Sequence, residues 1–587
     1  MWSSLDSVTF AGFTVSGPWF LAGAAAAVAA ALAIFRQIML PRPIPGIPYN
    51  KHSARRILGD LPDIIRYSNR RAWFVDQAQK HQSPVLQFFV SPFRDPIVFV
   101  FDHREAQNIA MRRVKEFDRS KLMGDMFSVA IPNGIICLQS STQQYKSNMT
   151  LIRELMTPTF LREVSGPHIH EKVIWLLQLW DEKAKVAAGR PFDASNDVHH
   201  AALDMIMGAS FGIEKPQSML QAGLETIERT KGKVPTVEDK DAVVNFEIPP
   251  LLPELHACKT IADSVGIALR SPVPWLNAII YRNFVPSMRN ALAVYGGMAR
   301  REIGKSVERL HSGHAQRCAM DQLTAREEVL AKKDGRKPDY YSEVIKDELL
   351  TYLIAGHETT SSALQWGLKY LTTDQRVQDK LRRAIQEAFP AAKAEGRLPT
   401  VEEIMSSQAR APYLDACLQE ILRLSRPLSI MTREAMVDTT LFGIPLPRGT
   451  NVSFTSNGPG YLSPPLHVDE EKRHESARAA KGKTGTPDSA TLAAFVPERW
   501  IREAADGSGD EFDAAASPFL TFGDGPRMCF GKRLAMLEMR VFMVLVLWHF
   551  ELRPVPEECE SDEEAIVLTR IPKNAWVRLE RIRYEKA

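Results

Sequence analysis

The sequence predicts a mainly α-helical protein with small β-sheets, preceded by one membrane-spanning helix at its N-terminus. Apolar residues recur at helical spacing over much of the chain between about residues 100 and 430. Short runs of β-branched and aromatic residues lie before and after that region and predict small sheets at its margins. The net charge of +3 over 587 residues gives no reason to expect nucleic-acid binding.

An apolar segment near the N-terminus predicts the membrane span. Trp19 to Phe35 is an unbroken run of apolar residues and Gly, close to the shortest length that crosses a bilayer. Basic residues follow the run, whereas only Asp6 precedes it, so the positive-inside rule places the rest of the chain in the cytosol. A cleaved signal peptide is the alternative, but such a peptide normally begins with basic residues. We therefore expect residues 1–40 to form a single-pass anchor.

The chain after this segment divides into a short hinge and one large domain. Four prolines within residues 41–50 exclude a continuous helix and predict a semi-rigid spacer. Residues 51–587 are then expected to form this large domain. Within it, the polar stretch from His467 to Thr491 predicts a mobile surface loop. The six cysteines are widely spaced without any CxxC pair, which favours free thiols in a reducing compartment over disulfides.

One cysteine stands in a context with its own chemistry. Cys529 follows a glycine-rich segment that begins at Phe522, and it precedes a helical pattern that begins at Lys532. Unpaired N–H groups and the dipole at a helix start favour the thiolate, which is the form that binds metal. The glycines allow the loop to approach a flat cofactor closely. A single thiolate fits haem iron better than zinc, which takes about four ligands.

A long helix is predicted from Glu343 to Thr372, and its middle reads Ala-Gly-His-Glu-Thr-Thr-Ser over residues 355–361. Gly356 and the neighbouring hydroxyl groups weaken the helical ladder and suggest a local widening where a small molecule lodges. Glu358 beside Thr359 offers a proton path to that place. Taken alone, a buried helix with Ser and Thr bonded to its own backbone explains the segment equally well. His357 is interpreted as a helix residue rather than a ligand.

A second predicted helix begins at Pro412 and ends before Pro427. Glu420 and Arg423 stand three residues apart on it and lie within reach of each other. In isolation this pair would be a surface ion pair of little energetic weight. Arg499 lies farther on, in the segment Pro-Glu-Arg-Trp of residues 497–500.

These segments, in this order, resemble the motifs of the cytochrome P450 family. Residues 522–531 match its haem-binding signature, Phe-x-x-Gly-x-Arg-x-Cys-x-Gly, at every fixed position. Residues 355–359 resemble the family's Ala/Gly-Gly-x-Asp/Glu-Thr motif. Glu420 with Arg423 resembles its Glu-x-x-Arg pair, and Arg499 resembles the arginine of its Pro-x-Arg segment, with Trp500 where many members carry Phe. The resemblance covers nearly the whole chain and implies a P450-like fold after the anchor.

The resemblance also implies roles for single residues. Cys529 would be the axial ligand of the iron in haem b (iron protoporphyrin IX). Thr359 would hydrogen-bond the bound dioxygen, and Glu358 would gate protons to it. The other implied cofactor-binding residues are Arg527, Arg433, Phe522, Gly531 and Arg153, and the implied buried structural network is Glu420, Arg423 and Arg499.

Arg153 is the weakest of these assignments. It resembles the arginine of the family's C-helix, with a trailing Pro-x-Phe, and would contact a haem propionate. The Trp or His expected four residues earlier is Met149, while Tyr145 lies one further turn back. The departure puts the propionate contact on this side in doubt.

The function implied by the resemblance is that of a haem-thiolate monooxygenase. It would insert one oxygen atom from O2 into a lipophilic small molecule such as a secondary metabolite, a terpenoid or a fatty-acid-like compound. The distal pocket would be lined by the stretch before Gly356, by residues 428–432 and by residues 569–572.

Partners and location follow from the same resemblance. Because the sequence ends soon after Cys529, electrons from NADPH are expected from a separate membrane-bound flavoprotein reductase, with Lys532 and Arg533 as part of its docking face. The anchor, the hinge and the long insertion resemble microsomal fungal members, which implies the endoplasmic reticulum membrane with a cytosolic catalytic domain. The alternatives are a haem-thiolate isomerase, dehydratase or peroxide-using enzyme, which often lacks the acid–alcohol pair, and a non-catalytic haem-binding protein, which has no need of Thr359.

Overall fold

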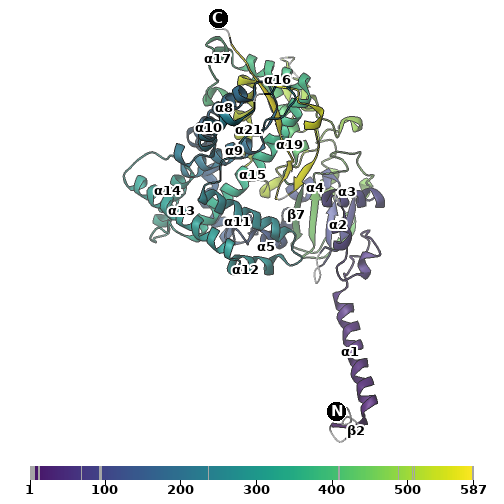
Figure 1. The fold of residues 1–587 in the computed structure, drawn as a ribbon. Coiled ribbons are helices and arrows are strands. Elements are labelled where there is room, and N and C mark those ends of the chain that lie inside the picture. The colour runs from purple at the N-terminus through teal and green to yellow at the C-terminus, as the bar shows by residue number, and fades with distance from the viewer. Residues whose placement is uncertain are drawn as a thin grey trace.

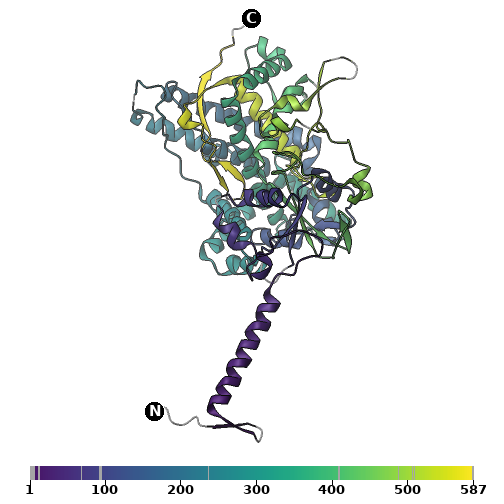
Figure 2. The ribbon, with the colours of Figure 1, turned by 90° about the vertical axis from the view of Figure 1, so that its right-hand side faces the viewer.

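The computed structural model describes residues 7–10, 13–67, 69–90, 95–235, 237–407, 410–486, 488–504, 507, 509–566 and 568–584, with side chains from residue 22 onward. A long N-terminal helix, α1 (Gly17–Met39), projects by itself from a large helical domain (Figure 1, Figure 2). Within α1, Ala22–Met39 has a mean hydropathy of 1.6 and is almost entirely exposed. By length and composition this helix is able to cross a membrane, in agreement with the predicted span.

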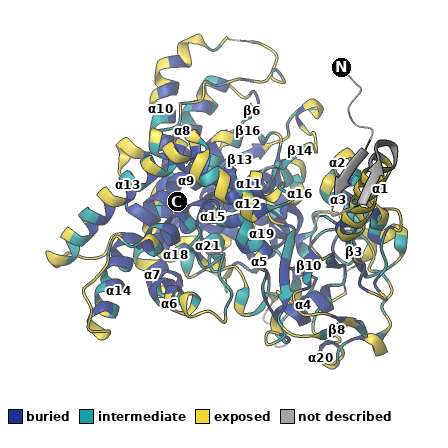
Figure 3. Ribbon diagram, turned by 90° about the horizontal axis from the view of Figure 1, so that it is seen from below, coloured by how far each residue is buried: buried dark blue, intermediate teal, exposed yellow. Residues whose placement is uncertain are grey.

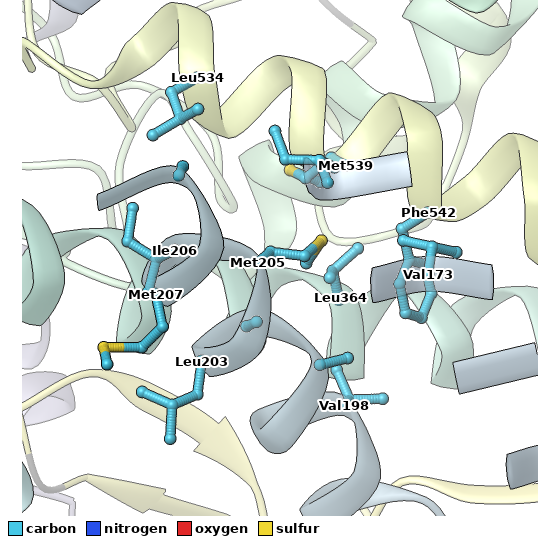
Figure 4. Close-up of a cluster of buried hydrophobic side chains, with 14 of the residues drawn as sticks. Val173, Val198, Leu203, Met205, Ile206, Met207, Leu364, Leu534, Met539 and Phe542 are labelled. Atoms are coloured by element: carbon cyan, nitrogen blue, oxygen red, sulfur yellow. The ribbon is translucent and has the colours of Figure 1, made fainter. Parts of the chain in front are cut away.

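Three long helices form the centre of the domain. The predicted central helix is α15 (Glu343–Thr373), and α9 (Ser195–Phe211) packs along it. The helix after the cysteine loop is α21 (Lys532–His549), which is buried over most of its length (Figure 3). Figure 4 shows the apolar core in which these helices meet, with Met205 of α9, Leu364 of α15 and Phe542 of α21 drawn as sticks. The predicted helix with Glu420 is α19 (Pro412–Ser425), which also packs on α15.

The other helices surround this centre or cover the sheet. They are α2 (Leu61–Arg66), α3 (Arg70–His81), α4 (His103–Met111), α5 (Lys121–Phe127), α6 (Gln143–Ile152), α7 (Pro158–Phe160), α8 (Gly166–Ala187), α10 (Met219–Thr230), α11 (Pro253–Leu269), α12 (Pro274–Phe284), α13 (Pro286–His311), α14 (Ala319–Lys333), α16 (Gln375–Ala388), α17 (Pro390–Ala394), α18 (Val401–Met405) and α20 (Glu475–Arg478).

The largest sheet has five strands and lies at one side of the helical centre. Its order is β3 (Val85–Phe88), β4 (Ile97–Val100), β10 (Asn451–Thr455), β7 (Ile430–Ala435) and β5 (Phe117–Arg119). Strand β10 runs parallel to β4 and antiparallel to β7, and β5 is antiparallel to β7. The register of the last pair places Arg119 directly opposite Arg433.

Small sheets complete the fold, as the sequence predicts. They pair β1 (Ser7–Phe10) with β2 (Phe13–Ser16), β8 (Thr439–Leu441) with β9 (Ile444–Leu446), β11 (Ile501–Glu503) with β12 (Asp510–Phe512), and β14 (Glu564–Ile566) with β15 (Arg570–Pro572). The three-stranded sheet has the order β13 (Phe550–Arg553), β16 (Trp576–Arg581) and β6 (Phe192–Asp193).

Residues 473–476, within the stretch 467–491 that the sequence predicts as a mobile loop, are bound to the rest of the domain. Arg473 is buried, and its guanidinium donates to both carboxylate oxygens of Asp102, at 2.6 and 2.8 Å. Ser476, at the start of α20, donates to the side chain of Asn108 on α4 at 2.7 Å. Polar residues of this stretch therefore bind partners on and beside α4, more than 350 positions earlier in the chain. The local composition of the stretch does not reveal such distant partners.

Candidate active site

The loop that carries Cys529 is closed by its own backbone. The N–H of Cys529 donates to the carbonyl of Phe522 at 2.7 Å, and the N–H of Met528 donates to that of Gly525 at 3.0 Å. Gly525 has φ +71°, and a Cβ there would lie 2.0 Å from the carbonyl oxygen of Ala110 on α4. Glycine is required at this position, and the sharp turn fixes the cysteine just ahead of α21.

Cys529 combines accessibility with desolvation. Its side chain is exposed, yet burial among protein atoms is the largest effect on its thiol and raises the pKa. The N–H groups of Gly531 and Lys532 bond the sulfur, and these bonds, with the charges of Arg119 and Lys532, lower the pKa in part. The donors at the helix start therefore act as the sequence predicts, but burial outweighs them. A sulfur that is both accessible and desolvated faces a space enclosed by the protein.

The middle of α15 also has an accessible residue in otherwise buried surroundings. Ala355 is exposed although it lies in the interior of a long, mainly buried helix, and Thr359 stands one turn later on the same face. The Thr359 hydroxyl donates to the carbonyl of Ala355 at 2.8 Å. The predicted local widening is wrong, because α15 continues as a regular helix through this segment. A Cβ on Gly356 would lie 2.7 Å from the side chain of Ile206, so this glycine admits the close approach of α9.

Three buried or partly buried arginines lie beside the cysteine loop. Arg433 donates to the carbonyl of Arg527 at 3.4 Å, and Arg527 donates to the carbonyls of Ile135 and Leu138, both at 3.0 Å. Burial and then the charge of Arg527 lower the pKa of Arg119 to about 9 and that of Arg433 to about 10. The Nε of Arg119 and the Nε and Nη1 of Arg527 have no hydrogen-bond partner in the part of the chain that the structure describes.

Such a cluster is costly without an anion. Like charges directly opposite on adjacent strands repel each other, and buried charges need a partner. The free guanidinium donors fit the carboxylates of a dianionic group, which bind arginine strongly. The two propionates of haem would meet this need with its iron at Cys529, so the residues present fit the implied cofactor. Arg119 was missed by sequence reasoning, because only the β5–β7 register brings it to Arg433.

The other predicted cofactor residues are placed as follows. Phe522 is half-buried, and its carbonyl receives the Cys529 N–H bond, while Gly531 lies at the start of α21. Arg153 is exposed at the end of α6, where its backbone N–H donates to the carbonyl of Met149, and its side chain has no hydrogen bond or ion pair among the described residues. Tyr145, on the same helix α6, lies next to the arginine cluster: the Arg527 guanidinium is 4.2 Å from the centroid of its ring.

The predicted structural network is assembled on α19. Glu420 is fully buried, and Arg423 donates to both of its carboxylate oxygens, at 2.7 and 2.9 Å. Arg499 donates to the same carboxylate at 3.0 Å, and so does the backbone N–H of Val496. The indole of Trp500 adds a bond of 2.8 Å, which the sequence did not predict. One buried carboxylate therefore accepts five hydrogen bonds that tie α19 to the segment before the cysteine loop.

The helical fold, the loop with one thiol and the arginine cluster define a haem-thiolate class of protein. The chain belongs to the cytochrome P450 family: the sequence profile described as "Cytochrome P450" matches residues 52–460 and 493–578. The gap in that match coincides with the stretch that packs on α4. The family implies a haem-thiolate centre, and the chain is a cytochrome P450 monooxygenase.

Curated relatives agree over nearly the full length. The chain is 35% identical to "Cytochrome P450 monooxygenase GME11363" of Pestalotiopsis microspora, over 94% of this chain and 97% of the relative. It is 32% identical to "Cytochrome P450 monooxygenase TRI13" of Fusarium sporotrichioides, over 94% and 98%. It is 35% identical to "Cytochrome P450 monooxygenase xilC" of Penicillium crustosum, over 92% and 93%. All three are fungal monooxygenases by name.

Proposed function

We propose that this P450 inserts one oxygen atom from O2 into a lipophilic small molecule of fungal secondary metabolism, with haem b held by Cys529. Electrons come from NADPH through a separate flavoprotein reductase, for which the exposed Lys532 and Arg533 beside the loop form part of the docking face. The observation that carries the proposal is the accessible Cys529 sulfur near three arginines, two of which, Arg119 and Arg527, have unused donors. The fungal monooxygenases among its relatives support the substrate class.

When bound, haem supplies the iron at which O2 is activated, and the chain supplies protons and positions the reactants. The Thr359 hydroxyl hydrogen is engaged with Ala355, which leaves its oxygen lone pairs free to accept a hydrogen bond from the enclosed space. Burial raises the pKa of Glu358, but the bond to His357 and the charges of His357, His199 and Lys259 together lower it to about 2. Glu358 is therefore an ionised group that accepts a proton before it passes one on.

Replacing Thr359 with alanine tests the acid–alcohol assignment. We expect NADPH oxidation to continue while product falls about 10-fold and hydrogen peroxide rises, because proton delivery to oxygen is misdirected. The measurement is product, peroxide and NADPH consumed, with purified reductase and a panel of lipophilic compounds. The control variant is Thr351→Ala. The Thr351 hydroxyl also lies on α15, and it donates to the carbonyl of Asp347, one turn before it. Product formation without NADPH or O2 in the wild type would instead support an isomerase, dehydratase or peroxide-using enzyme.

The residues of the predicted pocket lining have different surroundings. Met431 is so close to the cysteine loop that a Cβ on Gly523 would lie 2.9 Å from its sulfur. Leu428, at the other end of the predicted stretch, is exposed, and Thr569 is buried. We propose Leu428 as the substrate-lining member of residues 428–432, and we place Met431 on the cysteine-loop side.

We also propose that residues 1–40 anchor the enzyme in the endoplasmic reticulum membrane, that residues 41–50 act as a hinge, and that residues 51–587 form the cytosolic catalytic domain. Helix α12 supports this orientation, because it lies at the end of the domain from which α1 projects (Figure 1, Figure 2). Its outer face is apolar: Trp275, Ile279 and Phe284 are 48%, 50% and 73% exposed, with Leu276 and Ile280 beside them. Apolar residues at helical spacing on a surface helix fit the boundary of a bilayer.

The double variant Trp275→Glu/Ile279→Glu, made in a chain that lacks residues 1–40, tests the membrane face of α12. We expect binding to phospholipid vesicles to fall roughly 10-fold, because two apolar side chains are lost from the lipid boundary. Flotation with vesicles measures the bound fraction. The control is Val329→Glu on α14, where an equally exposed apolar residue lies on a different helix. Equal binding by both variants would leave α1 as the sole proposed membrane contact.

A further inference from the structure

Three titratable side chains meet where α9 packs against α15. His357 and Glu358 of α15 lie beside His199 of α9, and one nitrogen or oxygen atom from each of the three lies within 4.8 Å of the others. The rings of His199 and His357 meet edge to face, with centroids 5.3 Å apart. His357 is buried, whereas His199 is half-buried and thus nearer to solvent. The interpretation of His357 as a plain helix residue omits these contacts.

The hydrogen bonds of His357 determine where its proton lies. Its Nδ1 is 2.9 Å from the carbonyl oxygen of Leu353, which can only accept, so Nδ1 carries a hydrogen. Its Nε2 faces Glu358 Oε1 at 3.4 Å. A bare nitrogen lone pair opposite a carboxylate oxygen is repulsive, and one proton between the two atoms makes the contact attractive. The pair therefore holds one proton next to Thr359.

The titratable groups around the His357–Glu358 pair suit a site that holds one proton. His199 faces the pair from α9, with the ring of His200 centred 6.3 Å from that of His199, and Lys259 faces it from α11. Burial and the charges of His357, His200 and Lys259 lower the pKa of His199 to about 4, so this ring is neutral near pH 7 and free to take up a proton and release it. The ring nitrogens of His199 form no hydrogen bond with another described residue, so they are available to water.

We propose that His357 and Glu358 jointly hold the proton that is delivered toward Thr359, and that His199 is the solvent-side residue through which it is replaced. This rests on the proposed monooxygenase function and deepens it. Conversion of O2 into one inserted oxygen atom and one water consumes two protons and the two electrons of NADPH. For each proton, the His357 Nε2–H bond breaks as a Glu358 O–H bond forms. That O–H bond then breaks as the proton passes on toward the Thr359 hydroxyl oxygen, which leaves Glu358 ionised again. His357 then regains a proton that comes from solvent through His199.

The kinetic test compares His357→Gln and His199→Gln with wild type as haem-loaded, full-length enzymes. Glutamine keeps a hydrogen-bond donor at residue 357 but holds no exchangeable charge. With reductase and dodecanoic acid as a lipophilic probe, we expect the ratio of hydrogen peroxide to NADPH to rise roughly 5-fold in His357→Gln. We also expect the rate of NADPH use to lose its dependence on pH and on D2O. His199→Gln is expected to show a smaller change in the same direction.

The control is His200→Gln, which changes the adjacent buried histidine of α9 that does not contact the pair. It is expected to match the wild type in peroxide ratio and isotope effect. A purely structural role for His357 would lower the thermal stability of His357→Gln and leave its peroxide ratio and isotope effect unchanged. That result would overturn the proposal.

A second measurement needs no turnover. In oxidised, haem-loaded enzyme with ¹³C-labelled histidine, NMR reports whether the His357 ring carries one proton or two. We expect two in the wild type near neutral pH and one in Glu358→Gln, where the carboxylate is absent. A singly protonated ring in the wild type would overturn the proposal. A doubly protonated ring in an enzyme that uses neither NADPH nor O2 would instead contradict the proposed function and leave the proton-holding pair standing.

Discussion

Cys529→Ala is expected to abolish monooxygenase activity and to remove the strongly red-shifted Soret band of the reduced, carbon-monoxide-bound wild type. Cys529 is the cysteine that the described chain fixes in a glycine-rich turn at the start of α21, with two backbone N–H groups on its sulfur. Alanine provides no ligand at that place, so any haem retained by the arginines lacks thiolate coordination. The measurement is the difference spectrum of both proteins at equal concentration, with haem content measured separately.

Cys137→Ala is the matched control for this prediction. Cys137 also lies near Arg119, but burial raises the pKa of its thiol, and the thiol donates to the carbonyl of Ile131 at 3.2 Å. We expect this variant to keep the red-shifted band and its activity. A wild-type band typical of histidine-ligated haem, or none in folded protein, would contradict the assignment of Cys529.

Glu420→Gln is expected to destabilise the domain by about 3–5 kcal/mol, because it leaves two guanidinium groups buried without their negative partner. Arg423 and Arg499 both donate to this carboxylate, and the side chains of all three residues are almost fully buried. Domains are stable by only about 5–15 kcal/mol, so the yield of haem-loaded protein should fall sharply. Thermal unfolding and the ratio of haem to protein measure the effect, and residue 420 is not expected to affect substrate selectivity.

Two further variants are expected to lower the stability of the domain by smaller amounts. Trp500→Phe keeps the aromatic ring and removes one of five donors, so we expect a loss of about 1–2 kcal/mol with haem retained. Glu511→Gln breaks an ion pair with Arg502 in which both side chains are half exposed or more, and it should cost less than about 1 kcal/mol. Equal stability of the Glu420 and Glu511 variants would show that the buried network does not hold the fold.

The arginine cluster explains why one predicted contact is unnecessary. The family pattern led us to expect a propionate partner at Arg153, with doubt because Met149 replaces the usual aromatic residue. Arg153 is exposed, whereas Arg119, Arg433 and Arg527 gather beside the cysteine loop and Tyr145 covers one of them. Two of these three arginines have unused donors, so we expect the propionates to find partners here without Arg153.

Features that depend on neighbouring residues can be predicted from the sequence alone. The glycine turn before Cys529, the acid–alcohol pair in α15, the Glu420–Arg423 pair and the apolar α1 each lie within one short segment. Hydrophobic periodicity, proline and glycine positions and motif spacing therefore reveal them, and the bounds of α15 and α19 and the start of α21 follow closely.

Contacts between segments distant in the chain depend on the three-dimensional packing and are not predictable from local sequence. The strand register sets Arg119 opposite Arg433, the approach of α9 sets His199 on His357, and the fold of residues 497–500 turns the Trp500 indole to Glu420. The packing of Arg473 on Asp102, in a stretch that reads as a mobile loop, belongs to the same group. Local pattern fixes which face of an element is apolar, but the partner of a polar side chain depends on which element packs there. That choice is made by the whole core.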